Sequence, residues 1–128
     1  MAERIGLIRS DIKGIHQLRF DETVLEKTVL RMKEIFNGYN LLVVVVPSRA
    51  LWAGVDLKTA DKIHRAFIQH LDQQGVEYLD LRPTFEAHLE NPMGLHYKND
   101  GHWNKAGNAL ASEAIVDYLH VREKLSGL

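Results

Sequence analysis

The sequence predicts an α/β fold with a small parallel sheet, and two observations carry that prediction. Residues 41–46 read LLVVVV and end at Pro47. An apolar, largely β-branched run without polar alternation is typical of a strand covered on both faces, as in a parallel sheet. A helical pattern over 57–74 then leads to a second short strand, VEYLDL, at 76–81. Strand, helix and strand in this order form a βαβ unit, so we expect the two strands to pair in parallel.

Three further helices are predicted around these strands. In the first, over 21–38, apolar side chains recur at three- and four-residue steps up to Phe36. Asp21 is placed to cap its start and Gly38 to end it, as Gly75 ends the helix between the strands. The other two are a short helix at 83–89 and a last helix at 104–119, separated by a polar loop over 90–103.

Composition indicates one globular domain and excludes several classes of protein. The chain has 128 residues, 45% hydrophobic, without linker or repeat, and we expect a single domain over 1–128 in which residues 1–20 show no regular pattern. Sixteen basic and 17 acidic residues leave a net charge of -1, which predicts neither a nucleic-acid nor a membrane partner. Without cysteine there are no disulfides and no thiolate chemistry. The charged start of the sequence does not resemble a signal peptide, so we expect a soluble, cytoplasmic protein.

The loop before the last helix carries the main chemical signal. It contains Asp100 and His102, two residues apart across a glycine, so their side chains can converge if the loop turns there. A carboxylate beside an imidazole selects the ring tautomer and stabilises the imidazolium, as in nucleophile–base–acid catalysis. Alone, an Asp-x-His pair is a weak motif. The structural alternative is an Asx turn followed by Asn104 as a helix cap.

The wider segment, DGHWN followed by AGNALASEAI, resembles the catalytic segment of the SGNH/GDSL hydrolase superfamily, in a variant with Asp-x-His followed by Trp. The preceding order of helix, LLVVVVPSR, helix and GVEYLDLRPTF extends the resemblance over about 21–119. It implies a partial flavodoxin-like three-layer sandwich, with Asp100 and His102 as acid and base of a triad. The superfamily's Gly-Asp-Ser nucleophile motif does not occur in this sequence. The chain thus looks like half of a hydrolase.

Other residues at the ends of the predicted strands have alternative roles. Ser48 follows the first strand and is a substitute nucleophile, although a turn residue is the commoner reading. Arg49 is a candidate to bind an anionic group. A metal site made of His96, Asp100 and His102 is an alternative, but their spacing matches no closed structural site, and we expect neither metal nor cofactor. Trp103 is expected to pack and to wall a ligand pocket with Asn104 and His96, and Trp52 to pack nearby. His64, His70, His88 and His120 are expected at the surface or its boundary.

Two kinds of function follow from these residues. The first is a homo-oligomeric interaction or ligand-binding module that is not catalytic alone, for which we expect a homodimer joined by a sheet edge or by helix faces. The alternative is a hydrolase of small esters or acetyl esters, in which Asp100 and His102 act with Ser48 or with a serine from another chain.

Overall fold

The computed structural model describes residues 19–53, 56–88, 90–98 and 100–127. Residues 1–18, most of the segment 1–20 in which the sequence shows no regular pattern, lie outside the described residues. The elements in chain order are α2 (Glu22–Ile35), β1 (Val43–Val45), the 3₁₀ helix η1 (Arg49–Leu51), α3 (Leu57–Gln73), β2 (Tyr78–Asp80), α4 (Arg82–His88), the 3₁₀ helix η2 (Pro92–Leu95) and α5 (Lys105–Ser126).

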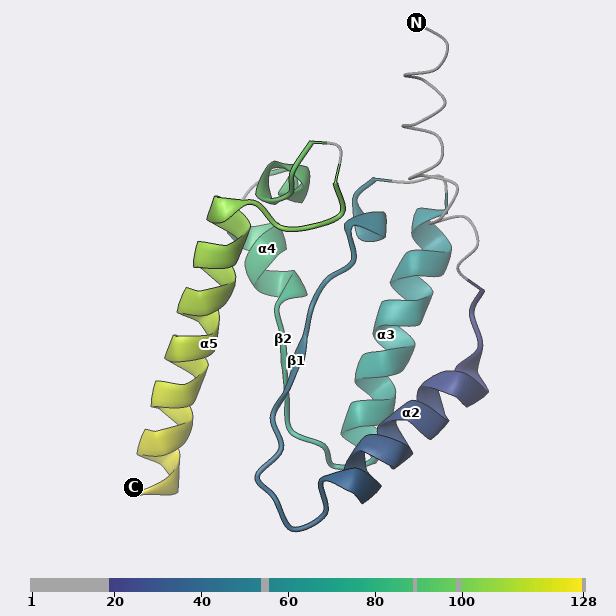
Figure 1. Ribbon diagram of the computed structural model, residues 1–128, viewed down its shortest axis with the longest axis vertical. Coiled ribbons are helices and arrows are strands. Elements are labelled where there is room, and N and C mark those ends of the chain that lie inside the picture. Colours follow the sequence, from purple (N-terminus) through teal and green to yellow (C-terminus); the bar gives the residue numbers. More distant parts are fainter. Residues whose placement is uncertain (1–18, 54–55, 89, 99, 128) are drawn as a thin grey trace, which may run out of the picture.

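The two strands form a parallel sheet, which confirms the predicted α/β class. Val43 pairs with Tyr78 and Val45 with Asp80. Both strands are shorter than the apolar runs that predicted them, because only the middle of each run is paired. In Figure 1, α5 lies on one side of the strands and α2 and α3 lie on the other. The arrangement is therefore three layers, helix, sheet and helix.

Each face of the sheet has its own core, which explains why β1 lacks polar alternation. Val45 packs with α2 and α3 in a cluster of Val29, Val45, Leu71 and Val76. Val44 points to the opposite face and packs against a cluster of Leu81, Phe85, Leu95 and Ala111, built by α4, η2 and α5. Because successive side chains of a strand point to opposite faces, a strand between two cores must be apolar at every position.

The helix ends follow the predicted caps with two corrections. Asp21 caps α2 by accepting a hydrogen bond from the Val24 N–H at 3.2 Å. The helix ends at Ile35, and Gly38 adopts φ +85° in the turn that follows, so Phe36 leaves the inward stripe and is 45% exposed. The predicted end of the last helix at residue 119 is wrong. α5 continues to Ser126, where Val121 and Leu125 keep the helical spacing but are 57% and 84% exposed, and Gly127 ends it at φ +69°.

One edge of β1 has no strand beside it within the described residues, where the sheet consists of β1 and β2. Val43 and Val45 direct their backbone groups toward β2: the Val43 N–H donates to Glu77 O at 2.9 Å, and Val45 O accepts from Leu81 N–H at 3.1 Å. In a parallel ladder the intervening residue, Val44, directs its N–H and C=O to the other edge. Val46, the next residue, is 55% exposed. Of the helices described, none has the length and apolar character needed to cross a bilayer.

Candidate functional site

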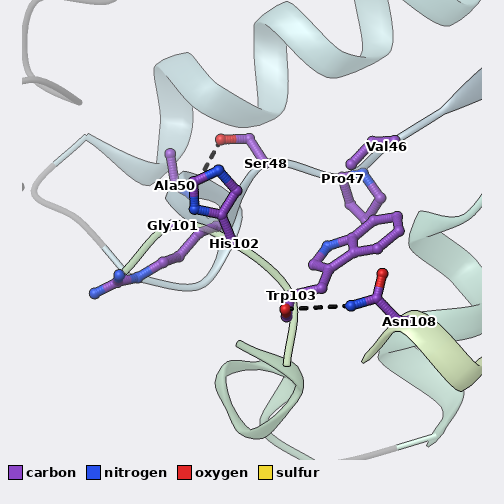
Figure 2. Close-up of a pocket in the computed structure, with 9 residues that line it drawn as sticks. Val46, Pro47, Ser48, Ala50, Gly101, His102, Trp103 and Asn108 are labelled. Atoms are coloured by element: carbon purple, nitrogen blue, oxygen red, sulfur yellow. Dashed lines mark hydrogen bonds between the residues drawn. The ribbon is translucent and has the colours of Figure 1, made fainter. Parts of the chain in front are cut away.

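A hollow of about 510 Å³ lies where β1 ends and the loop before α5 returns. The carboxyl ends of parallel strands are where α/β folds commonly place ligands. Figure 2 shows the hollow between the residues after β1 and the loop. Its lining residues are Val46, Pro47, Ser48, Arg49, Ala50, Gly101, His102, Trp103 and Asn108.

The loop that carries Asp100 and His102 has the form of a short hairpin. His96 and Trp103 face each other in an antiparallel bridge at its base. Above the base, the Tyr97 N–H donates to His102 O at 3.1 Å, and the Asp100 N–H donates to Tyr97 O at 3.3 Å. The loop is therefore closed on itself, and its tip holds the Asp-Gly-His sequence.

Asn104 fastens the base of this hairpin to α5. Its side-chain oxygen accepts from the Gly107 N–H at 3.0 Å, so it caps the helix as the sequence predicts. Its amide nitrogen also donates to the carbonyl oxygens of Gly94 at 2.7 Å and His96 at 3.2 Å. This one side chain therefore bonds to both η2 and the start of α5.

Gly107 is a steric requirement of the same junction. A Cβ atom at this position would overlap the backbone carbonyl oxygen of Leu95 and would lie 3.1 Å from Cβ of Trp103. Because both the carbonyl and the tryptophan belong to packed structure, only glycine lets α5 approach the loop this closely.

Asp100 and His102 meet at the tip of the loop. Nδ1 of the His102 ring is hydrogen-bonded to Oδ1 of Asp100, and the His102 backbone N–H donates to the same oxygen at 2.9 Å. The bond from the backbone N–H, followed by that from the ring, lowers the pKa of the Asp100 carboxyl, with a smaller contribution from the charge of Arg49. The His102 side chain is 87% exposed. Its Nδ1 faces the carboxylate, so Nε2 remains for chemistry.

Ser48 lines the same hollow, but its hydroxyl has a structural role. Oγ accepts a hydrogen bond from the Ala50 N–H at 3.2 Å and caps η1 (Figure 2). In the part of the chain that the structure describes, no hydrogen bond joins the Ser48 hydroxyl to the His102 ring. The pair does not show the nucleophile–base contact of a serine hydrolase.

Arg49 connects the two segments that meet at the hollow. It is the first residue of η1, and its Nη1 donates to the backbone carbonyl oxygen of Asp100 at 2.8 Å. The candidate anion-binding residue thus reaches the loop that holds the acid–base pair.

Aromatic residues form a floor beneath the loop. Phe85 lies with Trp103 at a centroid distance of 5.1 Å and stacks with Trp52 at 6.2 Å, and Trp52 in turn contacts the His96 ring at 5.6 Å. His96 is 4% exposed, and its Nδ1 lies 3.3 Å from Pro92 O. Burial lowers the pKa of His96, and the charge of Arg49 acts in the same direction. The structure therefore places His96 under the site and not among the residues that line the hollow.

Several features of the site were not predicted from the sequence. Asn108 lines the hollow and donates from its amide to Trp103 O at 3.3 Å and to Asn104 O at 3.0 Å. Its spacing of four residues from Asn104, on the first turns of the helix, was the available signal. Among the described residues, no three His, Asp or Glu side chains are grouped so that they could hold a metal ion, and the alternative set of His96, Asp100 and His102 is not brought together.

Two histidines of α3 lie deeper than their predicted surface or boundary positions suggest. His70 is 8% exposed, with Nε2 3.8 Å from Oε1 of Glu22, because it lies on the flank of α3 that meets α2. The side chain of His64 is 9% exposed, and its Nε2 lies 3.1 and 3.0 Å from the two carboxylate oxygens of Asp80. The chain therefore contains a second His–Asp pair, away from the loop.

Comparison with protein families gives a match over most of the chain. The family model described as "SGNH hydrolase-like domain, acetyltransferase AlgX" matches residues 17–128. No curated protein and no solved structure matches the chain. The match spans the described fold and the whole loop, and it confirms the resemblance seen in the sequence.

Proposed function

Because the chain belongs to the family described as SGNH hydrolase-like domain, acetyltransferase AlgX, we propose that it supplies the acid–base half of an acyl-transfer site. We propose further that the chain is not catalytic alone. The observation that carries the proposal is the contact between Asp100 and Nδ1 of His102. It holds the ring with Nε2 turned away from the carboxylate, as a general base requires. Acetyl esters are the proposed substrate class, because the family description names an acetyltransferase.

A hydroxyl nucleophile is the missing part of this half-site. His102 can accept a proton from a serine only if the hydroxyl comes within about 3 Å of Nε2. The Ser48 hydroxyl is engaged as a cap at Ala50, and the sequence has no Gly-Asp-Ser motif. We therefore propose that a serine from another chain completes the site. Direct use of Ser48 is the alternative.

Hydrolysis of p-nitrophenyl acetate tests whether the chain acts alone. We expect the purified protein to be barely faster than imidazole at the same concentration, and both His102→Ala and Ser48→Ala to change the rate little, since an unassisted imidazole is a weak catalyst. A burst of product that disappears in Ser48→Ala would contradict the proposal and make Ser48 the nucleophile.

The hollow favours a small ligand with an apolar acyl group. Val46, Pro47 and Ala50 form one wall, and Trp103 contributes a large aromatic surface. Arg49 lines the hollow and carries a positive charge, which suits a ligand that also carries a negative charge. Titration with acetate and with a neutral acetyl ester, followed in the amide spectrum, should shift the resonances of Ser48 to Ala50 and of Gly101 to Trp103. Shifts confined to other parts of the fold would contradict this assignment.

Self-association is a second proposed function, favoured by the edge of β1 that has no neighbouring strand among the described residues. The N–H and C=O of Val44 point to that edge, and the side chain of Val46, two residues further along the chain, is 55% exposed. Unpaired strand edges beside apolar surface promote pairing between chains. Light scattering after size exclusion should give about twice the chain mass of 14.6 kDa. A single-chain mass at high micromolar concentration would contradict the dimer. Val46→Lys should weaken it with little effect on the core.

A further inference from the structure

The tip of the 96–104 loop carries the acid–base pair, and among its described residues nearly all of the tip's hydrogen bonds are internal to the loop. Tyr97, Asp100 and His102 bond to one another around the tip. The Asp100 carboxylate projects from the backbone at the tip of the loop. A connection from the rest of the fold to that backbone therefore restrains where the carboxylate lies relative to the His102 ring.

Arg49 makes that connection. Within the described residues, the hydrogen bond that joins residues 100–102 to another element is the one from Arg49 Nη1 to Asp100 O, at 2.8 Å and across 51 positions of sequence. Arg49 is itself well placed, because it opens η1 directly after the end of β1 and the cap at Ser48. The Nε atom of Arg49 is buried, so the inner end of the guanidinium lies against the fold while Nη1 reaches the exposed loop.

We infer that Arg49 is a positioning residue for the acid–base pair: through the carbonyl of Asp100 it holds the tip of the loop so that the Asp100 carboxylate meets Nδ1 of His102. The inference rests on the proposed function, because the pair has a chemical role only there. It goes beyond ligand binding by Arg49, because it requires no ligand.

The tautomer of the His102 ring tests this inference without any assay of activity. Because Asp100 accepts at Nδ1, the neutral ring should carry its proton there, and nitrogen chemical shifts of the ring report this directly. We expect Arg49→Met, which keeps the alkyl chain and removes the donors, to reduce the ratio of the Nδ1–H to the Nε2–H form by roughly two- to tenfold, the effect of losing one hydrogen bond. Arg49→Lys should retain most of the ratio, since an ammonium group can donate to the same carbonyl.

Two further variants make the outcome decisive. Arg31→Met removes an exposed arginine paired with Glu34 on α2 and should leave the ratio unchanged. Asp100→Asn should abolish the preference. If Asp100→Asn has no effect, the acid–base pair itself, and with it the proposed function, fails. If Asp100→Asn acts but Arg49→Met does not, only the role of Arg49 is overturned. A loss in Arg49→Lys as large as in Arg49→Met would overturn the carbonyl bond as the cause.

Discussion

Two His–Asp pairs in this chain use the same groups in opposite surroundings. His64 and Asp80 lie between α3 and the end of β2, with side chains 9% and 20% exposed. His102 and Asp100 lie at the tip of a loop, with side chains 87% and 52% exposed. In the first pair Nε2 of the histidine faces the carboxylate, and in the second Nδ1 does.

This difference separates a structural pair from the pair that we propose to be reactive. Asp80 also accepts from the Arg82 N–H at 2.9 Å, so its carboxylate joins α3 to the start of α4. Ring and carboxylate there are both used to connect packed elements. At the loop, the carboxylate orients the ring, and the ring nitrogen that would do chemistry is left open. The role of a His–Asp pair therefore depends on which ring nitrogen faces the carboxylate and on what else the carboxylate is hydrogen-bonded to.

The largest expected contrast is in stability. Asp80→Ala should lower the free energy of unfolding by about 2 kcal/mol, because it leaves His64 and the Arg82 N–H without their partner in a mostly buried site. Asp100→Ala should leave the unfolding free energy close to that of the wild type, since its carboxylate faces solvent. Urea denaturation of the two variants measures the contrast. Equal losses would remove the distinction between the pairs.

Chemical modification should separate the same two histidines by accessibility. Diethyl pyrocarbonate reacts with an unprotonated ring nitrogen, so we expect His102 to be modified at least about tenfold faster than His64, whose ring is enclosed and hydrogen-bonded. Peptide mass spectrometry resolves the sites, and exposed His120 serves as an internal reference. Rapid labelling of His64 in the folded protein would contradict its buried position.

The stability of the fold should depend on pH through His96 at the base of the loop. Burial lowers the pKa of His96, so the folded protein binds this proton less readily than the unfolded chain does. The resulting stability is fully present above the unfolded value of about 6.5 and is lost as the pH falls through the lower folded value. Between about pH 7.5 and about pH 5.5, the wild type should therefore lose more stability than His96→Gln, which cannot titrate. Parallel urea curves at both pH values would contradict this.

The smallest expected effect concerns the carboxyl of Asp100. The backbone N–H of His102 is the largest cause that lowers the pKa of this group, ahead of the ring. His102→Ala should therefore raise the pKa of Asp100 only part of the way to its ordinary value. Carbon NMR of the labelled carboxyl follows the titration. A full return to the ordinary value would assign the whole effect to the ring.

Local patterns predicted the layers of this fold well because their physical causes are local. The apolar run that contains β1 needs two cores, and the structure provides both. Asp21 and Asn104 act as helix caps, as their positions before apolar periodic segments predicted. The predictions failed where no apolar contact marks the boundary, as at the end of α5, and where a residue leaves the helix before its stripe ends, as at Phe36.

The candidate site was only partly predictable for a different reason. Asp100 and His102 are two residues apart, so a tight turn alone can bring them together. The bond from Arg49 to Asp100 spans 51 positions, and the burial of His96 depends on Trp52 from another segment. Long-range contacts of this kind leave no trace in spacing or periodicity. The sequence therefore indicated that Asp100 and His102 can meet, but not which residues support them.

The glycine at position 107 has a consequence for how this family is searched and altered. Asp100 and His102 lie at one end of the segment DGHWNKAG. Gly107 lies at the other end, where the methyl group of an alanine would collide with the backbone of Leu95. A search pattern limited to the aspartate, the histidine and the tryptophan would thus admit sequences in which α5 cannot seat. Conversely, an engineered graft of the loop should carry all eight residues together. The minimal transferable unit therefore ends at Gly107, where the backbone of Leu95 lies too close for any side chain.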